Sequence, residues 1–101
     1  MHSRIELHDI LCGIMGNANA YYQPPESMKL KYPCIVYSLT DISKRNANNH
    51  PYKQDRKYQI TVIDKNPDST IPDRVLLLPY ARFANKFTSD NLNHFVFDLY
   101  F

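Results

Sequence analysis

The sequence contains very little glycine, with two residues among 101. Glycine-rich loops that cradle phosphates and the Gly-x-Ser-x-Gly turn that presents a nucleophilic serine are both missing. The acidic pairs Asp64 with Asp68 and Asp90 with Asp98 are spaced for capping and solvation rather than for proton transfer. We therefore expect that the protein is not an enzyme.

Cysteine is also scarce, since Cys12 and Cys34 are the only two in the chain. This is far below the density of a disulfide-stabilised fold, so we expect two reduced thiols that pack as small apolar side chains. Neither the cysteines nor the four histidines show the Cys-x-x-Cys or His-x-x-x-His spacing of metal sites. Convergence of Cys34 and His94 from neighbouring strands stays open, although a histidine on the solvated face of a strand is favoured. We expect no metal and no cofactor.

Long apolar runs are missing as well, because the longest aliphatic stretch covers residues 75–78. The first residues, MHSRIELHD, lack the charged and apolar regions of a signal peptide. We therefore expect neither secretion by a signal peptide nor a membrane span. The formal net charge of +2 predicts neither a general nucleic-acid binder nor an acidic tail.

Aromatic residues are abundant, with eight Tyr and five Phe but no Trp. Tyrosine is favoured at protein interfaces because it combines apolar area with a polar tip. A chain of 101 residues is long enough for one small domain and too short for two. We expect one domain over residues 1–101, with partners adding to a modest core.

The apolar spacing predicts an α+β fold. A capping box of Ser3 and Glu6 begins a helix at about 4–15, and Gly16-Asn17 ends it. The core-facing stripe of this helix is predicted to consist of Leu7, Ile10, Leu11, Ile14 and Met15. Residues 17–31 contain a Pro-Pro pair and no sustained period, so we expect a linker there.

The remaining elements are strands and one short helix. Alternating apolar residues predict roughly four strands, at about 32–39, 57–64, 80–87 and 93–101. A second short helix is expected at about 70–78, where Pro72 suits the first turn. Since a strand, a helix and a strand form a crossover, this helix should pack on one face of a mainly antiparallel sheet.

The last strand is the most clearly patterned one. In HFVFDLYF, one face carries Phe95, Phe97, Leu99 and Phe101, and the other carries His94, Val96, Asp98 and Tyr100. The Asp90-Asn91 turn before it favours a hairpin. We expect the phenylalanine face to close the sheet and to pack in the core.

The segment 43–56 is the most basic part of the chain. Together with Lys57 it carries five basic residues against Asp55 alone. Its polar composition predicts a long, mobile hairpin loop, either simply solvated or in contact with a partner chain or DNA. The residues expected at an interface or facing a lumen are Lys44, Arg45, His50, Tyr52, Lys53 and Arg56.

Four stretches of the chain carry a resemblance to a known family. They are YPCIVYSL (32–39), RKYQITVIDKNPDS (56–69), LLLPYARF (76–83) and DNLNHFVFDLYF (90–101). In order and spacing they resemble the tail terminator, or tail completion, proteins of long-tailed phages, also known as minor capsid or head-tail joining proteins. The resemblance covers roughly residues 32–101, and the family also has a helix at the N-terminal position.

The resemblance implies a structural virion protein without catalytic activity. It implies a homo-oligomeric ring, a hexamer, at the head-proximal end of the tail tube, which stops tube polymerisation and offers a surface to the head connector. The implied partners are the tail tube protein and the head-tail connector proteins, with transient contact to genomic DNA and no membrane. The implied location is the head-tail interface of the virion, after assembly in the host cytoplasm, and the 43–56 loop would face the tube lumen or the adjacent ring.

Two alternatives stay open. One is the head-completion or connector ring, which occupies the same junction. The other is a small nucleic-acid-binding module that uses the basic 44–57 segment with Tyr52 and Tyr58 as stacking partners.

Overall fold

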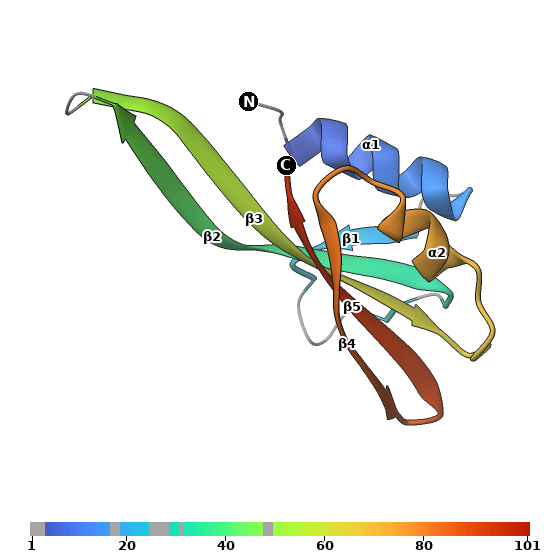
Figure 1. The fold of residues 1–101 in the computed structure, drawn as a ribbon. Coiled ribbons are helices and arrows are strands. Elements are labelled where there is room, and N and C mark those ends of the chain that lie inside the picture. Colours follow the sequence, from blue (N-terminus) through green and yellow to red (C-terminus); the bar gives the residue numbers. More distant parts are fainter. Residues whose placement is uncertain (1–3, 17–18, 25–28, 31, 48–49) are drawn as a thin grey trace.

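The computed structural model describes residues 4–16, 19–24, 29–30, 32–47 and 50–101, with side chains described outside 43–55 (Figure 1). Two helices and five strands form in these residues. In chain order they are α1 (Arg4–Met15), β1 (Ala20–Tyr22), β2 (Cys34–Ala47), β3 (His50–Asp64), α2 (Ile71–Leu76), β4 (Ala81–Ser89) and β5 (Leu92–Tyr100).

All five strands belong to one sheet, in the order β1-β2-β3-β5-β4. The β1 strand runs parallel to β2, and every other neighbouring pair is antiparallel. The predicted α+β class is therefore confirmed, whereas the expected count of four strands is wrong. The fifth strand is β1, inside the predicted linker 17–31, because three residues are too few to show an alternating pattern in the sequence.

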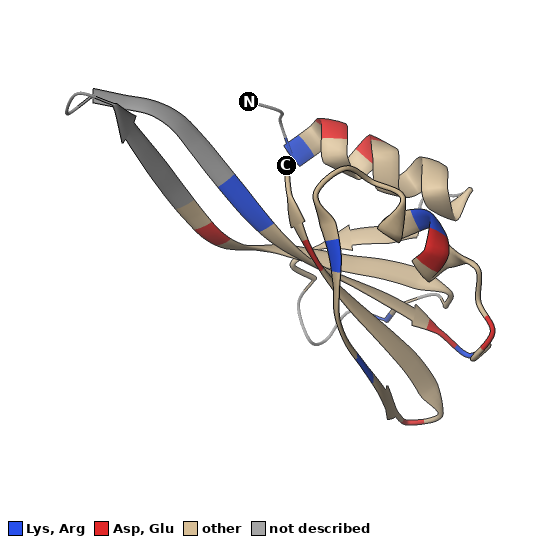
Figure 2. Ribbon diagram, viewed as in Figure 1, with Lys and Arg blue, Asp and Glu red and all other residues tan. Residues whose placement is uncertain are grey.

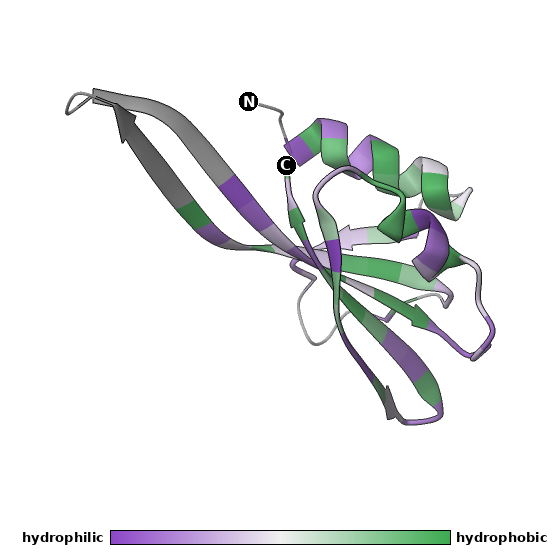
Figure 3. Ribbon diagram, in the orientation of Figure 1, coloured by the Kyte–Doolittle hydropathy of each residue, from purple (hydrophilic) through white to green (hydrophobic). Residues whose placement is uncertain are grey.

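Both helices cover the same face of the sheet (Figure 1). The register places apolar residues of β2, β3 and β5 in rows on that face, such as Tyr37 beside Ile60 and Ile60 beside Phe97. Leu7 and Leu11 of α1 and Val75 of α2 complete the core, and Figure 3 shows the apolar bands on these elements. Each large apolar side chain buried in this way contributes roughly 1.5–3 kcal/mol.

Helix α1 differs from its prediction in one residue of the stripe. Leu7 and Leu11 are fully buried, but Ile10 is exposed. The helix ends at Gly16, whose φ of 75° is the left-handed conformation that glycine favours, and Gly16 N donates to Cys12 O at 2.9 Å. The predicted cap Ser3 lies outside the described residues.

Helix α2 is shorter than the predicted range 70–78, since it ends at Leu76. Its Arg74 Nη1 donates to Ile14 O at 3.1 Å and so ties α2 to the last turn of α1. The β4–β5 hairpin turns on Asp90 and Asn91, both with positive φ, as a two-residue hairpin turn requires.

The largest difference between prediction and structure concerns residues 43–56, which were expected to form a loop. Instead, β2 continues to Ala47 and β3 begins at His50, and the two strands stay paired. Polar residues on both faces give no alternating pattern, so the sequence did not identify these strand halves. Residues 48–49 lie outside the described residues, and the expected mobility stays a prediction.

Candidate functional site

The most distinctive feature of the molecule is the arm, defined here as residues 41–57, where β2 and β3 extend beyond the rest of the domain (Figure 1). The ladder runs outward from the pair Asp41 and Lys57 to the pair Ala47 and His50. The molecule accordingly measures 51 Å along its longest axis and 25 and 23 Å along the others. Isolated two-stranded ribbons are only marginally stable in water.

Neither edge of the outer arm, residues 43–55, has a sheet neighbour among the described residues. On one side, β1 pairs with β2 only at residues 35–37, and on the other, β5 pairs with β3 only from Lys57 inward. The backbone N–H and C=O groups along both edges are thus available for a partner. We refer to the rest of the domain as the body.

Five of the six residues predicted at an interface have their backbone on the arm while their side chains lie outside the described set. These are Lys44, Arg45, His50, Tyr52 and Lys53. The sixth, Arg56, is half-buried at the root of the arm, and its carbonyl accepts from Phe101 N at 3.0 Å. The structure therefore brings all six onto one ribbon, and five basic residues against two acidic ones give the arm a formal charge of +3.

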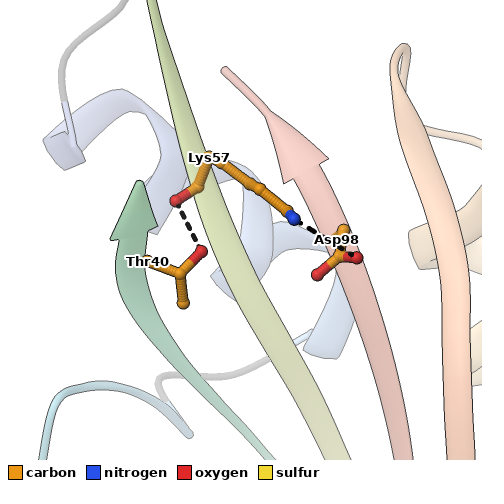
Figure 4. A network of polar contacts seen from close by, with 3 residues as sticks. All are labelled: Thr40, Lys57 and Asp98. Atoms are coloured by element: carbon orange, nitrogen blue, oxygen red, sulfur yellow. Dashed lines mark hydrogen bonds and ion pairs between the residues drawn. The ribbon is translucent and has the colours of Figure 1, made fainter. Parts of the chain in front are cut away.

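Three polar residues fix the root of the arm (Figure 4). The ladder shifts register between Leu39 and Asp41, so Thr40 is the extra residue of a bulge, a feature that bends a strand. Thr40 Oγ1 donates to Lys57 O at 3.0 Å, and Lys57 Nζ lies 3.8 Å from Asp98 Oδ2 of β5. The last strand thus braces the arm as well as the core.

The predicted core residues of β5 line the helical face. Phe97 and Leu99 are buried, and Phe95 and Phe101 are partly buried against the same core cluster. Phe101 follows the last ladder residue, Tyr100, and reaches the arm through its backbone.

A polar cluster under the start of α1 was not foreseen from the sequence. His8 Nδ1 lies 2.7 Å from the hydroxyl of Tyr37, which is fully buried, and Arg4 lies 4.5 Å above the ring of Tyr22. Burial raises the pKa of Tyr37, while a hydrogen bond from Arg4 and its positive charge oppose that rise. A tyrosine in the middle of a strand's core face was the available signal, because a buried hydroxyl needs a partner.

Cys34 and His94 do not converge. Cys34 of β2 pairs with Ile63 of β3, and Ile63 pairs with His94 of β5, so strand β3 lies between the two residues. His94 stacks on Phe87 at 4.6 Å instead. Within the described part of the chain, no group of three His, Cys, Asp or Glu side chains could hold a metal ion.

The two cysteines are free thiols. Cys34 is buried and Cys12 is half-buried, and burial raises the pKa of Cys34 to about 11. Of the acidic pairs, which were expected to cap and to be solvated, Asp64 is buried instead, and its Oδ1 accepts a hydrogen bond from Asn66 N at 3.0 Å in the turn after β3.

No helix in the described ranges is long and apolar enough to cross a lipid bilayer. Comparison with known proteins gives no relative: no protein-family model matches the chain, and neither does any curated protein.

Proposed function

We propose that the protein is a structural component of a phage virion. It forms a ring of six copies at the head-proximal end of the tail tube, ends tube polymerisation and presents the surface on which the head docks. Its chain does no chemistry in this role. The resemblance of four stretches within residues 32–101 to the tail terminator sequences, noted above, suggests this function.

The observation that carries the proposal is the arm. Its ribbon leaves the body with two unpaired backbone edges and, in the described residues, no sheet neighbour beyond Lys57. A feature of this kind gains stability when an adjacent subunit or ring covers it. A self-assembling ring on a tube supplies such neighbours on every copy.

Electron microscopy of tails made without this protein tests the proposal. We expect tubes that are longer than normal and carry no heads, because nothing stops polymerisation or connects the head. Tails of normal length beside unattached heads would instead assign the protein to the head-completion ring. Normal virions would contradict both roles.

A second candidate function, nucleic-acid binding by the arm, follows from its charge. The arm's +3 exceeds the formal net charge of +2 for the whole chain, so the rest is slightly acidic. If the arm binds DNA, replacing Lys44, Arg45 and Lys53 by glutamine should reduce the slope of log affinity against log salt by roughly one per lost phosphate contact. An unchanged slope would exclude this candidate.

A further inference from the structure

The outward face of α1 is an exposed surface of mixed apolar and acidic character. It consists of the residues at i, i+1, i+4, i+5 and i+8 from Ile5, which form one side of a helix. We call this set the α1 surface: Ile5, Glu6, Asp9, Ile10 and Gly13. Ile5 is 65 % exposed and Ile10 is 38 % exposed, so two aliphatic side chains lie beside two carboxylates on this face.

Nothing in the described residues requires glycine at position 13 of this surface. A Cβ added there would meet nothing within 4 Å, and its φ is not in the left-handed region. Glycine inside a helix is unfavourable relative to alanine, because it loses more backbone entropy on folding. A partner that approaches the helix closely would account for it.

The strand β4 carries the opposite combination. Phe83 and Phe87 are nearly half exposed, and the charged residues of the strand, Arg82 and Lys86, are both basic. The chain just before it adds Leu77 at 84 % and Tyr80 at 81 % exposure. We call these residues the β4 surface. It wraps around the edge of the sheet, because Phe83 and Lys86 lie beside Phe97 and Phe95 on the helical face, whereas Arg82 and Phe87 lie beside Asp98 and His94 on the opposite face. Figure 2 shows basic bands on β4 and acidic bands on α1, where a basic band marks only the first residue, Arg4.

The two surfaces lie toward different sides of the domain. Helix α1 packs near β1 and β2, which begin the strand order, and β4 is the edge strand at its other end. Both edges are poor templates for strand addition: β1 has three residues, and β4 has a register shift between Phe83 and Asn85 beside its basic residues. A helix laid over the edge is the other common way to cover it.

We propose that the α1 surface of one copy covers the β4 surface of the next copy. Apolar side chains meet apolar side chains at the centre, and the acidic residues of α1 face the basic residues of β4. Because the contact joins two different surfaces, it is head-to-tail and closes into a ring when the rotation permits. This inference rests on the self-assembly of copies in the proposed function and names the contact.

Two charge variants of the full chain test the contact. One is Glu6→Lys with Asp9→Lys, and the other is Arg82→Gln with Lys86→Glu. Gln is chosen at position 82 because Asp98 lies opposite in the register. Each variant alone should assemble roughly tenfold more weakly or worse in sedimentation velocity, because it faces its own copies with like charges.

An equimolar mixture of the two variants should restore assembly, because each altered surface then meets a complementary one. The two variants must alternate around such a ring, and a ring of six can close because six is an even number. Lys65→Glu and Asp68→Lys, exposed positions in the loop before α2, serve as separate controls that should assemble normally. Circular dichroism confirms that every variant is folded.

Gly13→Gln gives a readout that loss of folding cannot imitate. Glutamine favours helix and has free space in the single chain, so the melting temperature should stay equal or rise while assembly weakens. Wild-type oligomers that neither charge variant weakens would overturn the inference and leave the ring proposal standing. A wild-type protein that stays monomeric, with Glu6→Lys and Asp9→Lys reducing its binding to purified tubes, would also overturn it by assigning the α1 surface to the tube.

Restored assembly in the mixture, together with normal tails in the absence of the protein, would support the contact and contradict the proposed function. Overlong tails in the absence of the protein, together with assembly that neither charge variant weakens, would support the proposed function and contradict the contact. The two ideas therefore fail separately.

Discussion

The inner and outer halves of the β2–β3 hairpin belong to the same two paired strands, with a bulge at Thr40 between them, but differ in almost everything else. In the inner half, Tyr37 and Ile60 face each other, and both are fully buried under the helices. In the outer half, Ile42 is 47 % exposed and the partner strand offers Arg56 opposite it. Hydrogen bonding alone therefore does not define the domain, and the apolar alternation separates the body, which holds the core, from the arm.

The boundary between the halves is local and chemical. The bulge at Thr40 ends the alternation in β2, and Lys57 ends it in β3, whereas β5 keeps it through Leu99 to Phe101. The last residues of β5 lie on the body side and reach the first pairs of the arm. We therefore expect substitutions in the body to lower the free energy of unfolding, and substitutions in the arm to affect assembly with little loss of stability.

Deletion of residues 98–101 should have the largest effect, because it removes part of the body itself. Leu99 is buried and Phe101 is partly buried, and each such side chain contributes roughly 1.5–3 kcal/mol against a total of about 5–15 kcal/mol for a domain. We expect no cooperative thermal transition by circular dichroism. A truncated protein that melts cooperatively and still assembles would place the strand outside the core.

Two isoleucine substitutions compare the halves directly. Ile60→Ala leaves a cavity under the helices and should lower the free energy of unfolding by roughly 2–5 kcal/mol. Ile42→Ala, at an exposed arm position, should change it by less than about 0.5 kcal/mol. Urea unfolding measures both, and equal losses would show that the arm contributes to the folding core.

Alkaline pH tests the burial of Cys34 in the body. Its pKa is raised to about 11 in the folded state, so the unfolded thiol ionises first. The neutral Cys34 thiol contributes fully to the free energy of unfolding below the unfolded pKa of about 9. This contribution, roughly 2–3 kcal/mol, is lost as the pH rises through about 11. The difference in unfolding free energy between wild type and Cys34→Ala should therefore shrink between about pH 9 and pH 11. A constant difference would mean that the thiol is accessible to water.

The brace at the root of the arm should have the smallest effect on stability. Lys57 and Asp98 are each about one third exposed and 3.8 Å apart, so Asp98→Asn should cost less than about 1 kcal/mol. Urea unfolding in dilute buffer and in about 1 M salt measures this, and the cost should vanish in salt. A larger, salt-independent loss would place Asp98 in the folding core rather than in a brace.

The body could be predicted from the sequence where the pattern repeats. The apolar alternation over 57–64 predicted a strand, and its residues Tyr58, Ile60 and Val62 are the buried face of β3, while the periodic leucines predicted α1. The outer halves of β2 and β3 could not be predicted, because they carry polar residues on both faces. Strand β1 could not be predicted because it has only three residues.

The candidate site was predictable only as a position in the chain. Its basic composition identified 43–56, but the backbone pairing came from the structure. The contact of His8 with Tyr37 joins residues 29 apart, and the complementarity of α1 and β4 depends on where the sheet order places them. Ile10 shows the limit of periodicity, because it fits the apolar stripe yet faces outward.

The most direct test of the division between body and arm is to remove the outer arm alone. Because Ile42 and Arg56 are directly paired, an Asn-Gly turn in place of residues 43–55 should reconnect the strands in register. We predict a protein that unfolds cooperatively with nearly the wild-type free energy but fails to restore normal tail length in electron micrographs of tails made with it. A shortened protein that is unfolded, or one that restores normal tails, would contradict the account.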